Sequence, residues 1–91
     1  MHPLKEEKSP AMKANVYVTL KEEVLDPQGE AVRRALDSLG FAGVKRVRVG
    51  KLIEIDVDGS PSEAEPKLRS MCEKLLANPI VEDFELEIER T

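Results

Sequence analysis

VKRVRVGKLIEIDV, residues 44–57, is the stretch that decides the fold. Its odd positions carry five aliphatic side chains and its even positions carry charged ones: Val47, Val49, Ile53, Ile55 and Val57 against Arg46, Arg48, Glu54 and Asp56. This period-two alternation predicts a strand with one dry face and one wet face. Gly50 interrupts the pattern and leaves two interpretations, a β-hairpin or one long strand bent at the glycine. We favour the bent strand, because it keeps every odd position on the same side.

Upstream of this stretch the sequence predicts a strand followed by a helix. Val16, Val18 and Leu20 alternate with polar residues, which is typical of a strand. Asp26-Pro27 then predicts a helix start, in which Asp26 caps the free N–H groups and proline occupies the first helical position. Gly40 predicts the helix end. The apolar stripe of this helix comprises Ala31, Val32, Ala35, Leu36 and Leu39.

Downstream the pattern repeats, with a second helix and a last strand. Ser60 and Glu63 match a capping box. Pro66 would displace a backbone hydrogen bond, so we expect a kink there or a helix that is regular only from about Glu65. The helix should end near Ala77, and its apolar stripe comprises Leu68, Met71, Cys72, Leu75 and Leu76. Residues 82–89 alternate apolar and acidic side chains and predict a strand.

The order β-α-β-α-β predicts an α+β fold, a two-layer sandwich with both helices on one face of a mainly antiparallel sheet and the long bent strand at its centre. Residues 13–91 form the single domain, and residues 1–12 are expected to be a flexible leader or an added extension. A sheet this small has two open edges, so we expect a homo-oligomer, a dimer or a dimer of dimers.

Composition argues against two classes of partner. The formal net charge of −4 and the presence of only three aromatic residues disfavour nucleic-acid binding. No apolar run is long enough to cross a membrane. The single cysteine, Cys72, cannot form an internal disulfide, which is compatible with the cytoplasm.

The sequence offers little for catalysis. Its one histidine, His2, lies in the leader, and no His, Cys and carboxylate cluster has metal-ligand spacing. Cys72 falls on an apolar stripe and is expected to be a buried hydrophobe rather than a nucleophile. We therefore predict no catalytic, cofactor-binding or metal-binding residue in this chain.

Three polar features remain, each with a structural and a functional interpretation. The turn containing Asp26 and Gly29 is a capped helix start, or a site at which Gly29 allows something to pack close to the backbone. The basic residues Lys45, Arg46, Arg48 and Lys51 form a solvated strand face or a docking patch. Asn78 and Pro79 form a helix stop, in which the Asn78 side chain can hold the turn.

Three segments together resemble the PurS family, the small subunit of phosphoribosylformylglycinamidine synthase. They are LDPQGEAVRRAL (25–36), VRVGKLIEIDV (47–57) and CEKLLANPIVEDFELEI (72–88). The resemblance spans nearly all of residues 13–89, and its departures are the leader and Pro66. No segment is distinctive alone, but the D-P-x-G turn, the V-G-K strand and the N-P helix end are jointly specific.

The resemblance implies a non-catalytic, dimeric subunit that bridges a glutaminase and a large ATP-dependent synthetase in de novo purine synthesis and supports ammonia transfer between them. ATP, Mg²⁺ and glutamine would be used by those partners and not bound by this chain. The resemblance suggests three docking loops, formed by Asp26 with Gly29, by Arg48, Gly50 and Lys51, and by Asn78 with Pro79. The competing interpretation is a small dimeric ligand-binding regulatory domain.

Overall fold

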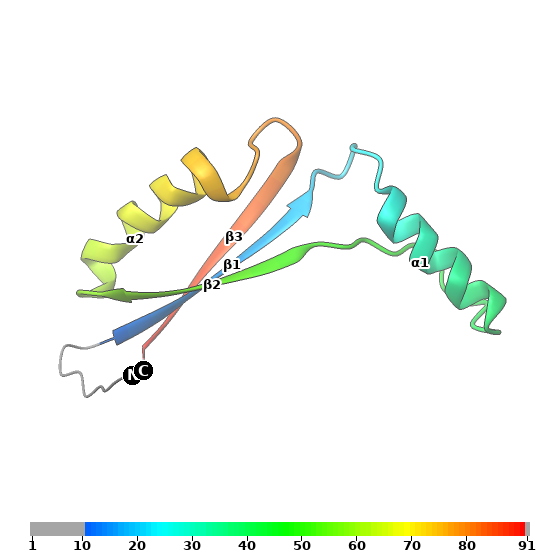
Figure 1. Ribbon diagram of the computed structural model, residues 1–91, viewed down its shortest axis with the longest axis horizontal. Helices are drawn as coiled ribbons and strands as arrows, with labels where there is room; N and C mark the ends of the chain where they lie inside the picture. Colours follow the sequence, from blue (N-terminus) through cyan, green and yellow to red (C-terminus); the bar gives the residue numbers. More distant parts are fainter. Residues whose placement is uncertain (1–10, 91) are drawn as a thin grey trace, which may run out of the picture.

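The computed structural model describes residues 11–90, which form one sheet and two helices (Figure 1). In chain order the elements are β1 (Ala11–Leu20), α1 (Pro27–Ser38), β2 (Lys51–Asp58), α2 (Pro61–Met71), the π-helical turn η1 (Cys72–Leu76) and β3 (Glu82–Arg90). The strands lie in the order β2-β1-β3, and both pairings are antiparallel. The predicted α+β class, with a mainly antiparallel sheet, is confirmed.

The first strand is longer than its sequence pattern predicted. Residues 1–10 of the expected leader lie outside the described residues, but Ala11 and Met12 already belong to β1. Met12 pairs with Val57 and is only 2% exposed, so β1 starts ahead of the alternation over residues 16–20 that predicted it. The pattern missed this start because alanine, lysine and asparagine in residues 13–15 are poor strand formers.

The core lies between β1 and α2. The even-numbered side chains of β1, from Met12 to Val18, are buried beneath the helix. Leu68 and Cys72 are fully buried against them from the other layer. Half-buried aliphatic and aromatic side chains of β2 and β3 complete the two clusters: Ile53, Ile55, Val57, Phe84, Leu86 and Ile88. The side of the sheet away from α2 carries the odd-numbered positions of β1.

The segment 44–57 continues through Gly50 without a hairpin. Residues 51–58 pair with β1, whereas residues 44–50 are extended but belong to no strand. The central strand of the sheet is therefore β1, and β2 is an edge strand, which corrects the expected position. A β-carbon at Gly50 would lie 2.6 Å from the Val18 carbonyl oxygen, so glycine permits the close approach of this segment to the backbone of β1.

The first helix does not cover the sheet, in contrast to the prediction that both helices share one face. Residues 27–50, which we term the arm, project from one end of the sheet (Figure 1). The radius of gyration is 17.6 Å, whereas a compact chain of this length has about 12 Å. Side chains of the predicted apolar stripe are consequently exposed, Leu39 by 72% and Val32 by 39%. The amphipathic pattern was real, but its apolar face has no cover within the described chain.

The second helix is continuous from Pro61 through Pro66 to Met71, so the alternative of a late start near Glu65 is wrong. The residue four positions earlier, Ser62, is exposed, and water can therefore hydrate the carbonyl that loses its hydrogen-bond donor. Ser60 caps the start by accepting a hydrogen bond from the Glu63 N–H (3.3 Å), as predicted.

The end of this helix widens into η1, where the Ala77 N–H donates to the Cys72 carbonyl (3.0 Å). This turn alters the predicted apolar stripe. Cys72 is buried and Leu76 half-buried, but Leu75 is 82% exposed, and Met71 is 39% exposed. The change in helical pitch moves Leu75 away from the sheet, because a π-helical turn holds more residues than an α-helical one.

Candidate functional site

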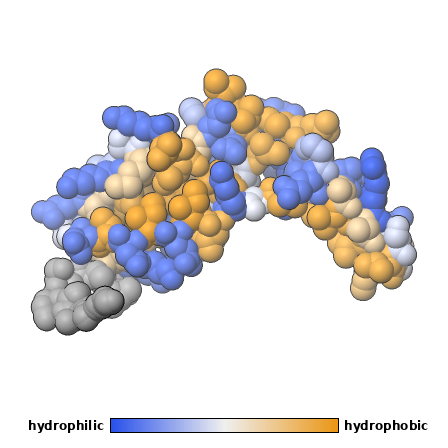
Figure 2. Space-filling model, in the orientation of Figure 1, coloured by the Kyte–Doolittle hydropathy of each residue, from blue (hydrophilic) through white to orange (hydrophobic). Residues whose placement is uncertain are grey.

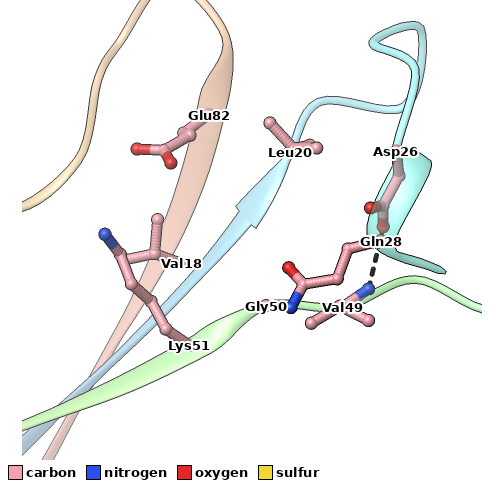
Figure 3. A pocket seen from close by; sticks show the side chains of 8 residues that line it. All are labelled: Val18, Leu20, Asp26, Gln28, Val49, Gly50, Lys51 and Glu82. Atoms are coloured by element: carbon pink, nitrogen blue, oxygen red, sulfur yellow. Dashed lines mark hydrogen bonds between the residues drawn. The ribbon is translucent and has the colours of Figure 1, made fainter. Parts of the chain in front are cut away.

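Asp26 lies where the arm leaves the sheet, and its carboxylate joins the two chain segments that cross there. One oxygen accepts a hydrogen bond from the Gly29 N–H at the start of α1 (2.9 Å). The other accepts from the Val49 N–H of the returning segment (2.9 Å), which is drawn as a dashed line in Figure 3. Asp26 is thus the predicted helix cap and also a bridge between both ends of the arm.

The electrostatics of this position favour the ionised carboxylate. The Gly29 N–H, and then the Val49 N–H, lower the pKa of Asp26 below its usual value, with a further contribution from the nearby Arg48 guanidinium. Burial acts in the opposite direction but is the weaker effect. Asp26 is 8% exposed, so its two hydrogen bonds are largely shielded from water.

Gly29 is required by close packing of backbone on backbone. A β-carbon at this position would lie 2.1 Å from the Val47 carbonyl oxygen and 2.7 Å from the Asp26 carboxylate. Glycine in the first turn of a helix is otherwise unfavourable. Its function here is to let α1 approach the returning segment, as the sequence suggested when it indicated something packed close to the backbone.

Arg48 holds the turn between β1 and α1. Its guanidinium donates to the carbonyl oxygens of Lys21 (2.8 Å), Leu20 (3.0 Å) and Val24 (3.3 Å). Arg46 points elsewhere and pairs with the exposed Glu22 at 3.0 Å. The predicted basic group is therefore divided, with Arg48 occupied inside the chain and its neighbours at the surface.

We term the junction the place where the arm leaves the sheet and the returning segment meets it, around Asp26, Gly29 and Val49. A pocket of about 270 Å³ opens beside the junction (Figure 3). Gln28 extends into it from α1, Lys51 lies at the start of β2 and Glu82 at the start of β3. The remaining lining residues are Val18, Leu20, Asp26, Val49 and Gly50. The lining thus combines one ammonium, that of Lys51, with two carboxylates, those of Glu82 and of the already hydrogen-bonded Asp26.

The third predicted loop is linked to this pocket through Glu82. The Glu82 carboxylate accepts a hydrogen bond from the Asn78 N–H (2.7 Å), and the Asn78 side chain accepts from the Ile80 N–H (3.1 Å). Asn78 therefore ties down the turn as predicted, and Pro79 is exposed beside it. Sequence reasoning missed Gln28 and Glu82, since neither belongs to a motif and each acts only through the fold.

Metal-ligand clusters and the cysteine thiol are the features of the described residues that bear on catalysis. Between residues 11 and 90 no group of three or more His, Cys, Asp or Glu side chains is placed to hold a metal ion. Cys72 is fully buried, and burial raises the pKa of its thiol. No described helix has the length and apolar character needed to cross a membrane.

The fold and the junction together define a class of protein. It is a small α+β assembly module in which polar residues fix the direction of a projecting, partly apolar arm. The chain matches the PurS family, described as phosphoribosylformylglycinamidine (FGAM) synthase, over residues 13–90. The chain belongs to this family.

Relatives and solved structures agree with this assignment. The chain is 48% identical over 77 residues to phosphoribosylformylglycinamidine synthase subunit PurS of Bacillus subtilis, with 85% of this chain and 92% of that protein covered. The crystal structure of PurS from Methanocaldococcus jannaschii is 40% identical, with a TM-score of 0.82 over 88% of this chain and 98% of that one. A chain in the structure of PurLQS from Thermotoga maritima is 34% identical, with a TM-score of 0.80 over 87% and 98%.

Proposed function

We propose that this chain is a non-catalytic subunit of phosphoribosylformylglycinamidine synthase in de novo purine biosynthesis. It would bridge the glutaminase subunit and the large ATP-dependent synthetase subunit, and so support the transfer of ammonia from one to the other. ATP, Mg²⁺ and glutamine would act at the partner subunits. The proposed location is the cytoplasm.

The projecting arm is the observation that carries a role in assembly. Leu39 is 72% exposed and Phe41 is 58% exposed, both near its far end. Figure 2 shows that apolar surface follows the arm and reappears between α2 and β3. Burying such side chains releases about 25 cal/mol per Å², so an uncovered arm favours association.

A second copy of the chain is the proposed cover for the arm, which gives a dimer or a dimer of dimers. Residues 44–50 are extended and unpaired in the described chain, and they continue directly into the edge strand β2. Apart from the Val49 N–H, which donates to Asp26, the backbone N–H and C=O groups of this segment belong to no strand pairing of the described chain and are suited to pairing with another chain. Both apolar and backbone groups of the arm would then be satisfied by the same contact.

The three predicted docking loops remain part of the proposal, although several of their side chains also act within the chain. Asp26, Gly29, Arg48 and Gly50 hold the junction by internal contacts. Lys51 and Pro79 are exposed, which leaves their side chains accessible to a partner. We therefore expect direct docking contacts from Lys51 and Pro79, and an indirect effect from the others through the pose of the arm.

Reconstitution with the two partner subunits tests the function. Omitting this chain should greatly reduce the glutamine-dependent synthesis of the amidine product. Ammonia-dependent synthesis by the large subunit alone should change much less, because it needs no transfer between subunits. Equal loss of both activities, or loss of neither, would exclude a bridging role.

The pocket beside Lys51 and Glu82 favours one competing function, a ligand-binding regulatory domain. Its volume of about 270 Å³ lies just below the usual range for small-molecule sites. A regulator should show thermal stabilisation by a small zwitterionic ligand, such as glutamine, in the absence of any partner subunit. A bridging subunit should not require such a ligand for assembly.

A further inference from the structure

The side of the sheet turned away from α2, which we term the outer face, is strongly acidic. Its described strand positions carry seven carboxylates and a single ammonium, that of Lys13. The carboxylates belong to Glu54, Asp56 and Asp58 of β2 and to Asp83, Glu85, Glu87 and Glu89 of β3. Lys13 pairs with Glu54 at 3.4 Å and Lys21 pairs with Asp83 at 2.8 Å, and the other five carboxylates have no ion pair with any described residue.

Asn15 lies at the middle of this face and is incompletely satisfied. Strand register places it between Glu54 and Glu87. Its amide nitrogen donates to Glu89 (2.8 Å) and Glu87 (3.2 Å), and the residue is only 5% exposed. Its oxygen, Oδ1, is buried and receives no hydrogen bond from any described residue. A buried acceptor without a donor is costly, so this position favours a further donor.

An apolar pair lies next to Asn15 on the same face. Tyr17 and Leu52 are directly opposite in register, and they are 42% and 50% exposed. The Tyr17 hydroxyl donates to Glu87 (3.0 Å), and Glu85 lies opposite Tyr17 on the other strand. An exposed aromatic residue surrounded by charged groups has the anatomy of a protein-binding surface, with an apolar centre and a polar rim.

We propose that the outer face binds an arginine-bearing basic segment of another subunit. A guanidinium is planar and donates up to five hydrogen bonds, so it can bridge Glu54 and Glu87 while its plane lies against the Tyr17 ring. When these glutamates turn onto the incoming arginine, Asn15 Oδ1 is uncovered and the guanidinium donates the hydrogen bond that it lacks, while the Asn15 amide nitrogen keeps its bond to Glu89 (2.8 Å). Leu52 then contacts the aliphatic part of the same segment.

Charge selects this occupant over a second copy of the chain. Packing two outer faces together would bring their unpaired carboxylates into contact, and desolvated like charges repel strongly. The arm has an exposed apolar stripe that already suits it to self-association, so the two surfaces serve different partners. This inference rests on the proposed function, because it takes the basic segment to belong to the glutaminase or the synthetase subunit.

The test measures binding of the purified glutaminase and synthetase subunits to the assembled chain by isothermal titration calorimetry. Glu54→Gln with Glu87→Gln is the test variant, and Glu65→Gln with Glu73→Gln, two exposed carboxylates on α2 and η1, is the charge-matched control. The test variant should bind one of the subunits at least about tenfold more weakly and with a flatter salt dependence. The control should bind like the unmodified chain.

Carbodiimide labelling of the unmodified chain gives a second measurement that does not depend on a variant folding. Glu54, Glu85 and Glu87 should be protected in the complex, whereas Glu65 and Glu73 should label equally with and without the partner.

Equal affinity of the two double variants, or no protection on the outer face, would overturn the inference and leave the bridging function intact. A change in the oligomeric state of the test variant alone would also overturn it, since the face would then be a self-interface. Failure of the unmodified chain to bind either subunit would remove the bridging function, and the inference with it.

Discussion

Gly29 and Val47 approach so closely that a β-carbon on residue 29 would lie 2.1 Å from the Val47 carbonyl oxygen. The approach joins the first turn of α1 to the segment that returns from it. Since α1 makes little contact with the sheet, this backbone contact and its neighbours determine where the arm points. The direction of the arm is therefore determined by the residues of the junction.

Replacing Gly29 by alanine should destabilise the protein by about 1–3 kcal/mol, because overpacking here moves backbone against backbone. The gain in helix propensity from alanine, about 1 kcal/mol, offsets only part of this. Gly43→Ala is the matched control, since a β-carbon there meets nothing within 4 Å. Urea unfolding at one fixed protein concentration would measure both variants, and equal midpoints would contradict the packing argument.

Asp26→Asn should cost about 1–2 kcal/mol, because an amide cannot serve both N–H donors as a carboxylate does. The pKa of Asp26 is lower in the folded state than in the unfolded one, mainly through the Gly29 N–H. Its contribution is therefore present above the unfolded value of about 3.9 and is lost as pH falls through the folded value.

Unfolding free energies measured between pH 7 and pH 2.5 would reveal this dependence. The unmodified protein should lose more stability on acidification than Asp26→Asn does. Asp37→Asn, at an exposed position on α1, should keep the full dependence. Parallel curves for the unmodified protein and Asp26→Asn would refute the role given to this carboxylate.

Arg48→Lys should destabilise the turn between β1 and α1 by about 1–3 kcal/mol. A single ammonium cannot reproduce the fork that reaches the carbonyls of Leu20, Lys21 and Val24. Arg46→Lys keeps an exposed pair with Glu22 and should change stability by less than about 1 kcal/mol. Thermal unfolding of the two variants side by side measures the difference, which should be absent if Arg48 is an ordinary surface residue.

Leu39→Glu should weaken self-association without unfolding the chain, because Leu39 is 72% exposed in the described structure. Light scattering coupled to size exclusion should show a smaller species than for the unmodified protein at the same concentration. Ser38→Glu places the same charge on the neighbouring exposed position of α1 and should retain the larger species. A monomeric unmodified protein at micromolar concentration would instead argue against the proposed oligomer.

Cys72 should be protected from thiol reagents in the native state. The residue is fully buried, and burial raises the pKa of its thiol, so little thiolate is available at neutral pH. Labelling by a disulfide reagent at pH 7.5 should be at least about a hundredfold slower than in denaturing urea. Fast labelling under native conditions would show that α2 opens readily from the sheet.

Local features of the fold could be predicted from the sequence because each is decided by a few adjacent residues. Asp26 caps α1, Gly40 adopts a positive φ of 99° after it, and Ser60 caps α2. The strand at 82–89 followed from strict alternation. Its observed bounds, Glu82–Arg90, differ by one residue.

Features that depend on distant residues could not be predicted in this way. The stripe on α1 gave its apolar face but not what covers that face, because an amphipathic helix looks the same whether its partner lies in its own chain or another. Arg48 could not be distinguished from Arg46 by pattern, since its three acceptors are backbone carbonyls from a loop more than twenty residues away. Periodicity also assumes a constant helical pitch, which fails at residues 72–76.

The wide turn at Cys72–Leu76 has a consequence for how this chain can vary. A π-helical turn is equivalent to one residue inserted into a regular helix. Deleting Glu73 or Lys74 would restore ordinary pitch, and Leu76 would then follow Cys72 by three residues and keep its place toward the sheet. The same deletion inside a regular helix would rotate everything beyond it by about 100°. The chain therefore has, at residues 72–76, a place where its length can change by one residue without turning the end of the helix away from the core.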